Sequence, residues 1–242
     1  MFPQTQRGTF AQAQDSALAR FMRQTFNYMT GGVALSGLVA YLTFHIPALM
    51  AFAVTPAAQI IFLVIWFGLG LFFHKLAERL SPAGALGAFA LFSAATGFGL
   101  VPIALMYTGA DITLAFIAAA AVFAGASAYG YMTKRSLAGL GAFLAVGGIA
   151  LMIMALVLIG MSFFGGVSQG ISILFSLLVV PFVTIAIAFK VNMLREGYMQ
   201  IANGSEADQA RMSITMALGF YTDFVVLFLH LLRLISALNN NR

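Results

Sequence analysis

Seven stretches of the chain are long enough and apolar enough to cross a membrane as helices. Each span of the hydrocarbon core needs about 20 apolar residues, and only helices or closed barrels satisfy their backbone polar groups there. The predicted spans are residues 27–44, 57–73, 83–106, 112–131, 137–159, 171–189 and 212–238. The chain is 62% hydrophobic and 8% charged, whereas soluble domains carry about 25% charged residues. The sequence therefore predicts an all-α, multi-pass membrane protein with seven transmembrane helices.

The seven spans are expected to form one domain, residues 25–242, because short connectors use up the remaining length. Residues 1–24 precede this domain as a polar, cytoplasmic tail that carries Arg7, Arg20 and Arg23. Apolar residues at helical spacing in the second half of the tail indicate a short surface helix, and an unstructured tail is the alternative. The tail has no apolar core of a cleavable signal, so we expect the first span to direct insertion.

The lysines and arginines between the spans predict how the chain is oriented. With the N-terminus in the cytoplasm, ten of them face the cytoplasm and only Arg233 and Arg242 face the other side. This asymmetry follows the positive-inside rule. We therefore expect a cytoplasmic N-terminus, with the C-terminus across the membrane unless the last segment is re-entrant. The basic residues are scattered and form no patch, so a nucleic-acid partner is not expected.

The residue inventory excludes several kinds of chemistry. The chain has no cysteine and only three scattered histidines, so we expect no thiolate chemistry and no metal site. It also lacks an HExxH motif, paired acids, and a nucleophile with a base at usable spacing. We therefore expect that the protein is not an enzyme and binds no cofactor.

Asp223 is the residue with the clearest functional implication, because it lies near the middle of the last apolar segment. A charged side chain at that depth costs at least about 2.5 to 3.5 kcal/mol. We interpret Asp223 as a titrating or ion-coordinating carboxylate, and the alternative is an aspartate that only hydrogen-bonds neighbouring helix groups. His230 lies seven residues further on, on nearly the same face, and is either a proton relay or an interfacial residue.

Several short motifs occur in a fixed order over about 160 residues. They are Ser81-Pro82, ATGFGL at 95–100 with Pro102, YGYMTKR at 129–135, FYTDF at 220–224 and LLRL at 231–234. In this order and spacing the chain resembles the Bax inhibitor-1 family, also called the transmembrane Bax-inhibitor-motif family. The motif residues to which the resemblance assigns a structural role are Gly97, Pro102, Gly130, Tyr131, Lys134 and Arg135.

The resemblance implies a fold in which six helices surround the last one. It also implies a pH-sensitive leak of calcium or protons through the bundle around Asp223, with a role in stress or ion homeostasis. Some bacterial members of this family look like modulators of a membrane-bound AAA protease, so a non-conducting regulator of such a partner is the alternative function. The expected location is the lipid bilayer of a bacterial inner membrane.

Lys190 marks a departure from the family pattern. Leak-type members pair the last-helix aspartate with a second aspartate in a Tyr-Asp-Thr-Gln run near the end of the sixth helix. Residues 188–192 (AFKVN) align with that run, which puts Lys190 at the aspartate and Asn192 at the glutamine. Opposite charges favour the charged form of both groups, so a proton shared between two carboxylates is lost. We hypothesise a Lys190–Asp223 ion pair, and the alternative is a lysine that reaches to the membrane surface.

Overall fold

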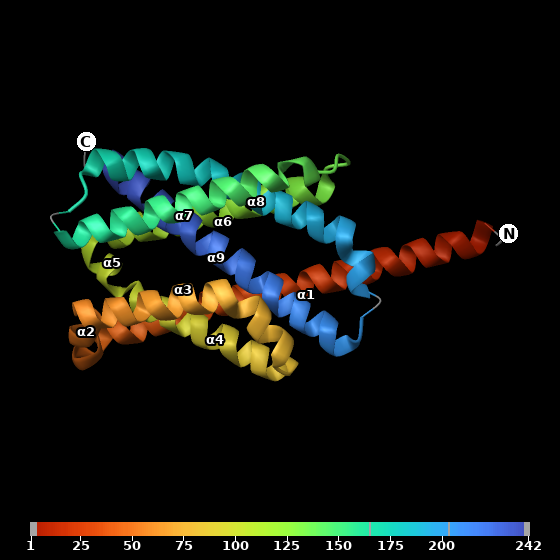
Figure 1. The fold of residues 1–242 in the computed structure, drawn as a ribbon, viewed down its shortest axis with the longest axis horizontal. Coiled ribbons are helices and arrows are strands. Elements are labelled where there is room, and N and C mark those ends of the chain that lie inside the picture. Colours follow the sequence, from red (N-terminus) through yellow and green to blue (C-terminus); the bar gives the residue numbers. More distant parts are fainter. Residues whose placement is uncertain (1–3, 165, 203, 240–242) are drawn as a thin grey trace. The chain divides into compact units, whose positions relative to one another are not determined.

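The computed structural model describes residues 4–164, 166–202 and 204–239, and its regular elements are all helical (Figure 1). The elements are α1 (Gln4–His45), α2 (Pro47–Ala53), α3 (Pro56–Arg79), α4 (Pro82–Gly99), α5 (Val101–Met106), α6 (Gly109–Met132), the 3-10 helix η1 (Ala138–Leu140), α7 (Gly141–Phe164), α8 (Gln169–Ala202) and α9 (Glu206–Asn239). Among the described residues, six segments are long and apolar enough to span a membrane, and the bent pair α1–α2 makes a seventh if it counts as one span. The prediction of an all-α membrane protein is confirmed.

Prolines and hydroxyl side chains determine where several of these helices begin. Helices α2, α3 and α4 each have proline in the first turn, where its missing N–H costs nothing. The hydroxyl oxygens of Thr55 and Ser81 accept hydrogen bonds from the first turns of α3 and α4, and Thr108 does the same for α6. The predicted third span is divided at Leu100 into α4 and α5, because Pro102 cannot continue the hydrogen-bond ladder.

Helix α1 is 42 residues long, which corresponds to about 63 Å and exceeds the roughly 30 Å of a hydrocarbon core. It runs from Gln4 into the predicted first span without a break at residue 24. The helix ends at His45, and α2 follows at an angle of 107°. Ile46 is extended between them, as expected for the residue before Pro47.

The chain divides into two compact units. The first contains the chain up to Met106 together with Tyr198–Tyr221, and the second contains Tyr107–Gly197 and the chain from Thr222 onward. Helix α9 is continuous across the boundary, so one half of it belongs to each unit.

In the first unit, α9 is held by a buried polar contact to α1. Tyr221 is fully buried, and its hydroxyl lies 2.5 Å from Ser36 Oγ, which in turn donates to the carbonyl oxygen of Ser93 at 2.7 Å. The ring of Tyr221 also meets the rings of Phe89 and Phe92 edge-on. A residue that combines a packed ring with a satisfied hydroxyl specifies one register of α9 against α1 and α4.

Tyr221→Phe is expected to lower the free energy of unfolding by about 1 kcal/mol, because the ring stays packed while one buried hydrogen bond is lost. The measurement is the unfolding transition in detergent, with the exposed Tyr129→Phe as the matched control. Equal stability of the two variants would show that the Tyr221 hydroxyl does not hold α9 in place.

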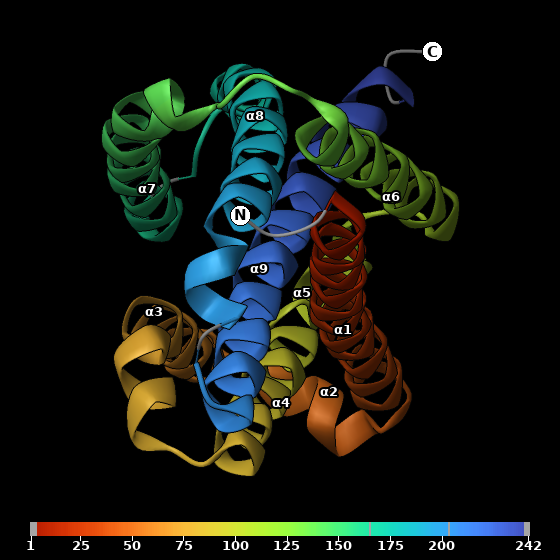
Figure 2. The same cartoon turned by 90° about the vertical axis from the view of Figure 1, so that its right-hand side faces the viewer.

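In the second unit, α6 and α8 flank the second half of α9 (Figure 2). The ring of Phe224 packs edge-on against Phe116 and Phe123 of α6. Helix α7 lies against α8, where Phe182 fills the space beside Gly147. Within each unit, therefore, α9 is in contact with more than one other helix.

Candidate functional site

Lys190 of α8 and Asp223 of α9 form an ion pair in the second unit. Lys190 Nζ lies 2.8 Å from each of the two carboxylate oxygens of Asp223. The Asp223 side chain is 13% exposed and the Lys190 side chain 39% exposed. These distances are those of charge-assisted hydrogen bonds, so the ammonium group neutralises the carboxylate directly. The predicted ion pair is present, whereas its role as an ion pathway or pH switch stays a prediction.

The length of α8 explains how a lysine reaches a carboxylate in the middle of α9. The sequence predicts that the sixth span ends at residue 189, which would leave Lys190 at the membrane surface. The helix itself is longer than this predicted span, because α8 continues to Ala202, twelve residues beyond Lys190. The residues after 189 are more polar but contain no proline, so the helix continues where the apolar run stops. Lys190 is therefore inside a helix, and its ammonium group is bound to Asp223 rather than extended toward the surface.

His230 is not part of this ion pair. Its Nδ1 lies 2.9 Å from the Ser176 hydroxyl on α8, and its ring contacts Phe175 edge-on. His230 follows Asp223 by seven residues, or about 10.5 Å along α9, which is far longer than a hydrogen bond. The structure thus places His230 and Asp223 on the same two helices but in separate polar contacts, and a relay between them stays a prediction.

Two motif glycines mark places where helix backbones touch. A Cβ atom on Gly97 would lie less than 3.0 Å from the backbone of Ser36 in the first unit. A Cβ atom on Gly130 would lie equally close to the backbone of Ala188 in the second unit. Glycine is required at both positions because only a hydrogen atom fits between the two helix backbones.

The other motif residues lie at helix ends. Pro102 is in the first turn of α5. The backbone carbonyl of Tyr131 accepts a hydrogen bond from Arg195 Nη1 at 2.6 Å, which satisfies one of the last carbonyl groups of α6. Lys134 and Arg135 are exposed in the connector between α6 and η1. Lys134 and Arg135 thus lie directly after the end of α6, and the structure does not place them beside Asp223.

The sequence analysis aligns Asn192 with the family's glutamine but predicts no structural role for it. It is 0% exposed, and its amide makes three hydrogen bonds to the backbone of Gly130, Arg135 and Leu137. The sequence signal is one amide side chain between the apolar residues Val191 and Met193. Its partners are more than fifty residues away, so only the folded chain identifies them.

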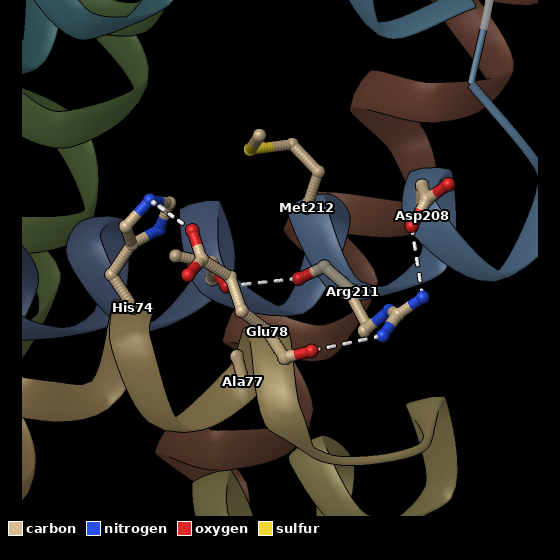
Figure 3. A pocket seen from close by; sticks show the side chains of 7 residues that line it. His74, Ala77, Glu78, Asp208, Arg211 and Met212 are labelled. Carbon is tan, nitrogen blue, oxygen red and sulfur yellow. Dashed lines mark hydrogen bonds and ion pairs between the residues drawn. The ribbon is translucent and has the colours of Figure 1, made fainter.

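The first unit contains a small pocket between the end of α3 and the start of α9, with a volume of about 170 Å³ (Figure 3). His74 and Glu78 form a contact of 3.3 Å on one wall, and Asp208 and Arg211 form a contact of 2.8 Å on the other. Arg211 Nη1 also donates to the backbone carbonyls of Glu78 and Leu80, which fastens α9 to the end of α3.

Within the described part of the chain, no three His, Cys, Asp or Glu residues are grouped to hold a metal ion.

Comparison with known proteins covers both units of the fold. A family model described as "Inhibitor of apoptosis-promoting Bax1" matches residues 18–241. An uncharacterized protein of Lactococcus lactis, YrjE, is 35% identical over 239 residues, which cover 96% of this chain and 97% of the relative. The inner membrane protein YbhL of Escherichia coli is 31% identical over 221 residues, which cover 90% of this chain and 92% of the relative. The match of the family model over nearly the whole length shows that the chain belongs to the Bax inhibitor-1 family of membrane proteins.

Proposed function

We propose that this protein is a proton leak of the Bax inhibitor-1 type whose pathway past Asp223 is held closed by Lys190. The observation that carries the proposal is the contact of 2.8 Å between Lys190 Nζ and both oxygens of Asp223. A carboxylate in the middle of a span is a site where a proton can bind during transfer. An ammonium group on both of its oxygens occupies that site, so protons pass only when the ion pair opens.

The same geometry favours a proton over calcium as the ion. A divalent cation prefers six to eight oxygen ligands, whereas Asp223 supplies one carboxylate that a positive charge already covers. Lys190 also repels a second cation at this site. Calcium, the other ion that the resemblance implies, is therefore the weaker candidate.

The proposed setting is a bacterial inner membrane with the N-terminus in the cytoplasm. The distribution of ten basic residues on one side and two on the other supports this orientation. One relative, YbhL, is named an inner membrane protein. In this setting a controlled leak would act in ion homeostasis or in a response to stress. The proposed activity involves no enzymatic reaction, and the partner is the surrounding lipid bilayer.

Lys190→Met is expected to raise the proton permeability of liposomes that contain the protein by about tenfold, which corresponds to about 1.4 kcal/mol in the opening equilibrium. Removal of the ammonium group frees the carboxylate to take up protons. The measurement is the decay of an imposed pH gradient, with Lys75→Met, an exposed lysine of α3, as the matched control. The double variant Lys190→Met with Asp223→Asn should lose the leak again, and a folded Lys190→Met as tight as wild type would contradict the proposal.

A second candidate function is a non-conducting regulator that modulates a membrane-bound AAA protease or another membrane partner. The observation that favours it is the apolar run Phe224–Leu229, which separates Asp223 from His230 on α9. A proton would have to cross that stretch without a polar group on the helix. This candidate predicts no change of ion flux in any Asp223 variant, and a changed rate of substrate degradation when the protein is added to the reconstituted protease.

A further inference from the structure

Asn192 is a buried polar residue that the proposed pathway does not use, two positions beyond Lys190 on α8. Its Oδ1 accepts a hydrogen bond from the backbone N–H of Leu137 at 2.8 Å. Its Nδ2 donates to the carbonyl oxygens of Gly130 and Arg135, each at 3.4 Å. One side chain therefore binds the end of α6 and the connector that follows it, residues 133–137.

Two neighbouring residues of α8 hold the same region. Arg195 Nη1 donates to the carbonyl oxygen of Tyr131 at 2.6 Å, and the Ser136 hydroxyl donates to Glu196 Oε2 at 2.8 Å. Helix α6 has no glycine after its last turn, and Asn192 and Arg195 of α8 donate instead to carbonyl groups at its end. Among these contacts only those of Asn192 are made by a fully buried side chain, and burial makes their loss costly.

The position of Asn192 determines the direction in which Lys190 points. Successive residues of an α-helix are about 100° apart, so Lys190 and Asn192 lie on nearly opposite faces of α8. The hydrogen bonds of Asn192 to α6 and the connector therefore fix the rotation of α8 about its axis and its position along that axis. The ammonium group is carried on a four-carbon side chain, so the part of α9 that it can reach depends on how the backbone of α8 is held.

We infer that Asn192 is a positioning residue for the Lys190–Asp223 ion pair, and that it couples the connector 133–137 to that pair. The inference rests on the proposed function for its consequence, the closed pathway, but its first effect is on Lys190 itself. When the Asn192 bonds are lost, α8 turns or shifts, the ammonium group leaves the carboxylate, and the pathway opens.

The test measures the reactivity of Lys190 in the full-length protein in liposomes. A small, uncharged reagent that reacts with amino groups is added for a fixed time, and the modified fraction of Lys190 is determined by mass spectrometry. Asn192→Leu removes all three hydrogen bonds at similar volume, and Asn192→Asp keeps the shape and the acceptor for Leu137 but loses both donors. Thr184→Val is the matched control, because Thr184 also lies on α8 but bonds only within its own helix, to Val180.

Both Asn192 variants are expected to raise the labelling rate of Lys190 by roughly tenfold, whereas Thr184→Val leaves it unchanged. Proton permeability should rise in parallel, and Asn192→Leu should add nothing to the leak in a Lys190→Met background. Unchanged labelling in the folded Asn192 variants would overturn the inference. Raised labelling without raised permeability would keep Asn192 as the positioning residue and would overturn the proposed function instead.

Discussion

Gly130→Ala is expected to destabilise the protein by about 2 to 3 kcal/mol, because the added Cβ overlaps the backbone of α8. That atom would lie less than 3.0 Å from Ala188, and the obstacle is a carbonyl group rather than the end of a flexible side chain. Helices α6 and α8 must therefore separate, with a cost typical of overpacking. Because Ala188 is two residues from Lys190, the separation should also weaken the ion pair.

The matched control is Gly125→Ala on the same helix. A Cβ atom at Gly125 meets nothing within 4 Å, so alanine there should be neutral or stabilise α6 by up to about 1 kcal/mol. The measurement compares the unfolding transitions of both variants in the same detergent. If Gly130→Ala unfolds at the same point as Gly125→Ala, the close approach of α6 and α8 is not what holds the second unit together.

Lys190→Met is expected to lower the free energy of unfolding by about 3 kcal/mol. The variant leaves the carboxylate of Asp223, a side chain only 13% exposed, without its positive partner. Removal of one member of a buried ion pair costs about 3 to 5 kcal/mol, and the partial exposure of Lys190 places this case at the lower end. The same unfolding measurement in detergent gives the value.

A double variant separates the cost of an unpaired charge from the value of the pair. Lys190→Met with Asp223→Leu removes both charges, and replacement of a buried ion pair by apolar residues is often neutral. We therefore expect the double variant to recover most of the stability that the single variant loses. If the two changes instead add, the two side chains do not interact in the folded protein.

The spans could be predicted from the sequence because the requirement for about 20 apolar residues acts locally along the chain. The helix ends could not be predicted equally well. Helix α8 ends at Ala202 rather than 189, and α9 begins at Glu206 rather than 212. Hydropathy shows where the chain leaves the hydrocarbon core, whereas a helix ends where its backbone hydrogen bonds stop. Between α8 and α9 this happens near Gly204.

The candidate site was predicted only in part. The cost of a charge in an apolar segment identified Asp223, and the family pattern identified Lys190 as its partner. Asn192 and Ser36 were not recognised as structural residues, since their partners depend on how distant helices pack. Buried amide and hydroxyl groups are common in membrane helices, and their contacts are decided by tertiary structure.

The most direct test of the central claim compares proton leak in liposomes between wild type and Lys190→Asp over a range of pH. Lys190→Asp replaces the ion pair by two carboxylates, which share a proton and so titrate as a pair. If Lys190 keeps the pathway closed, wild type is tight at neutral pH and Lys190→Asp gains a pH-dependent leak. If wild type already leaks with the same pH dependence as Lys190→Asp, the ion pair does not close the pathway.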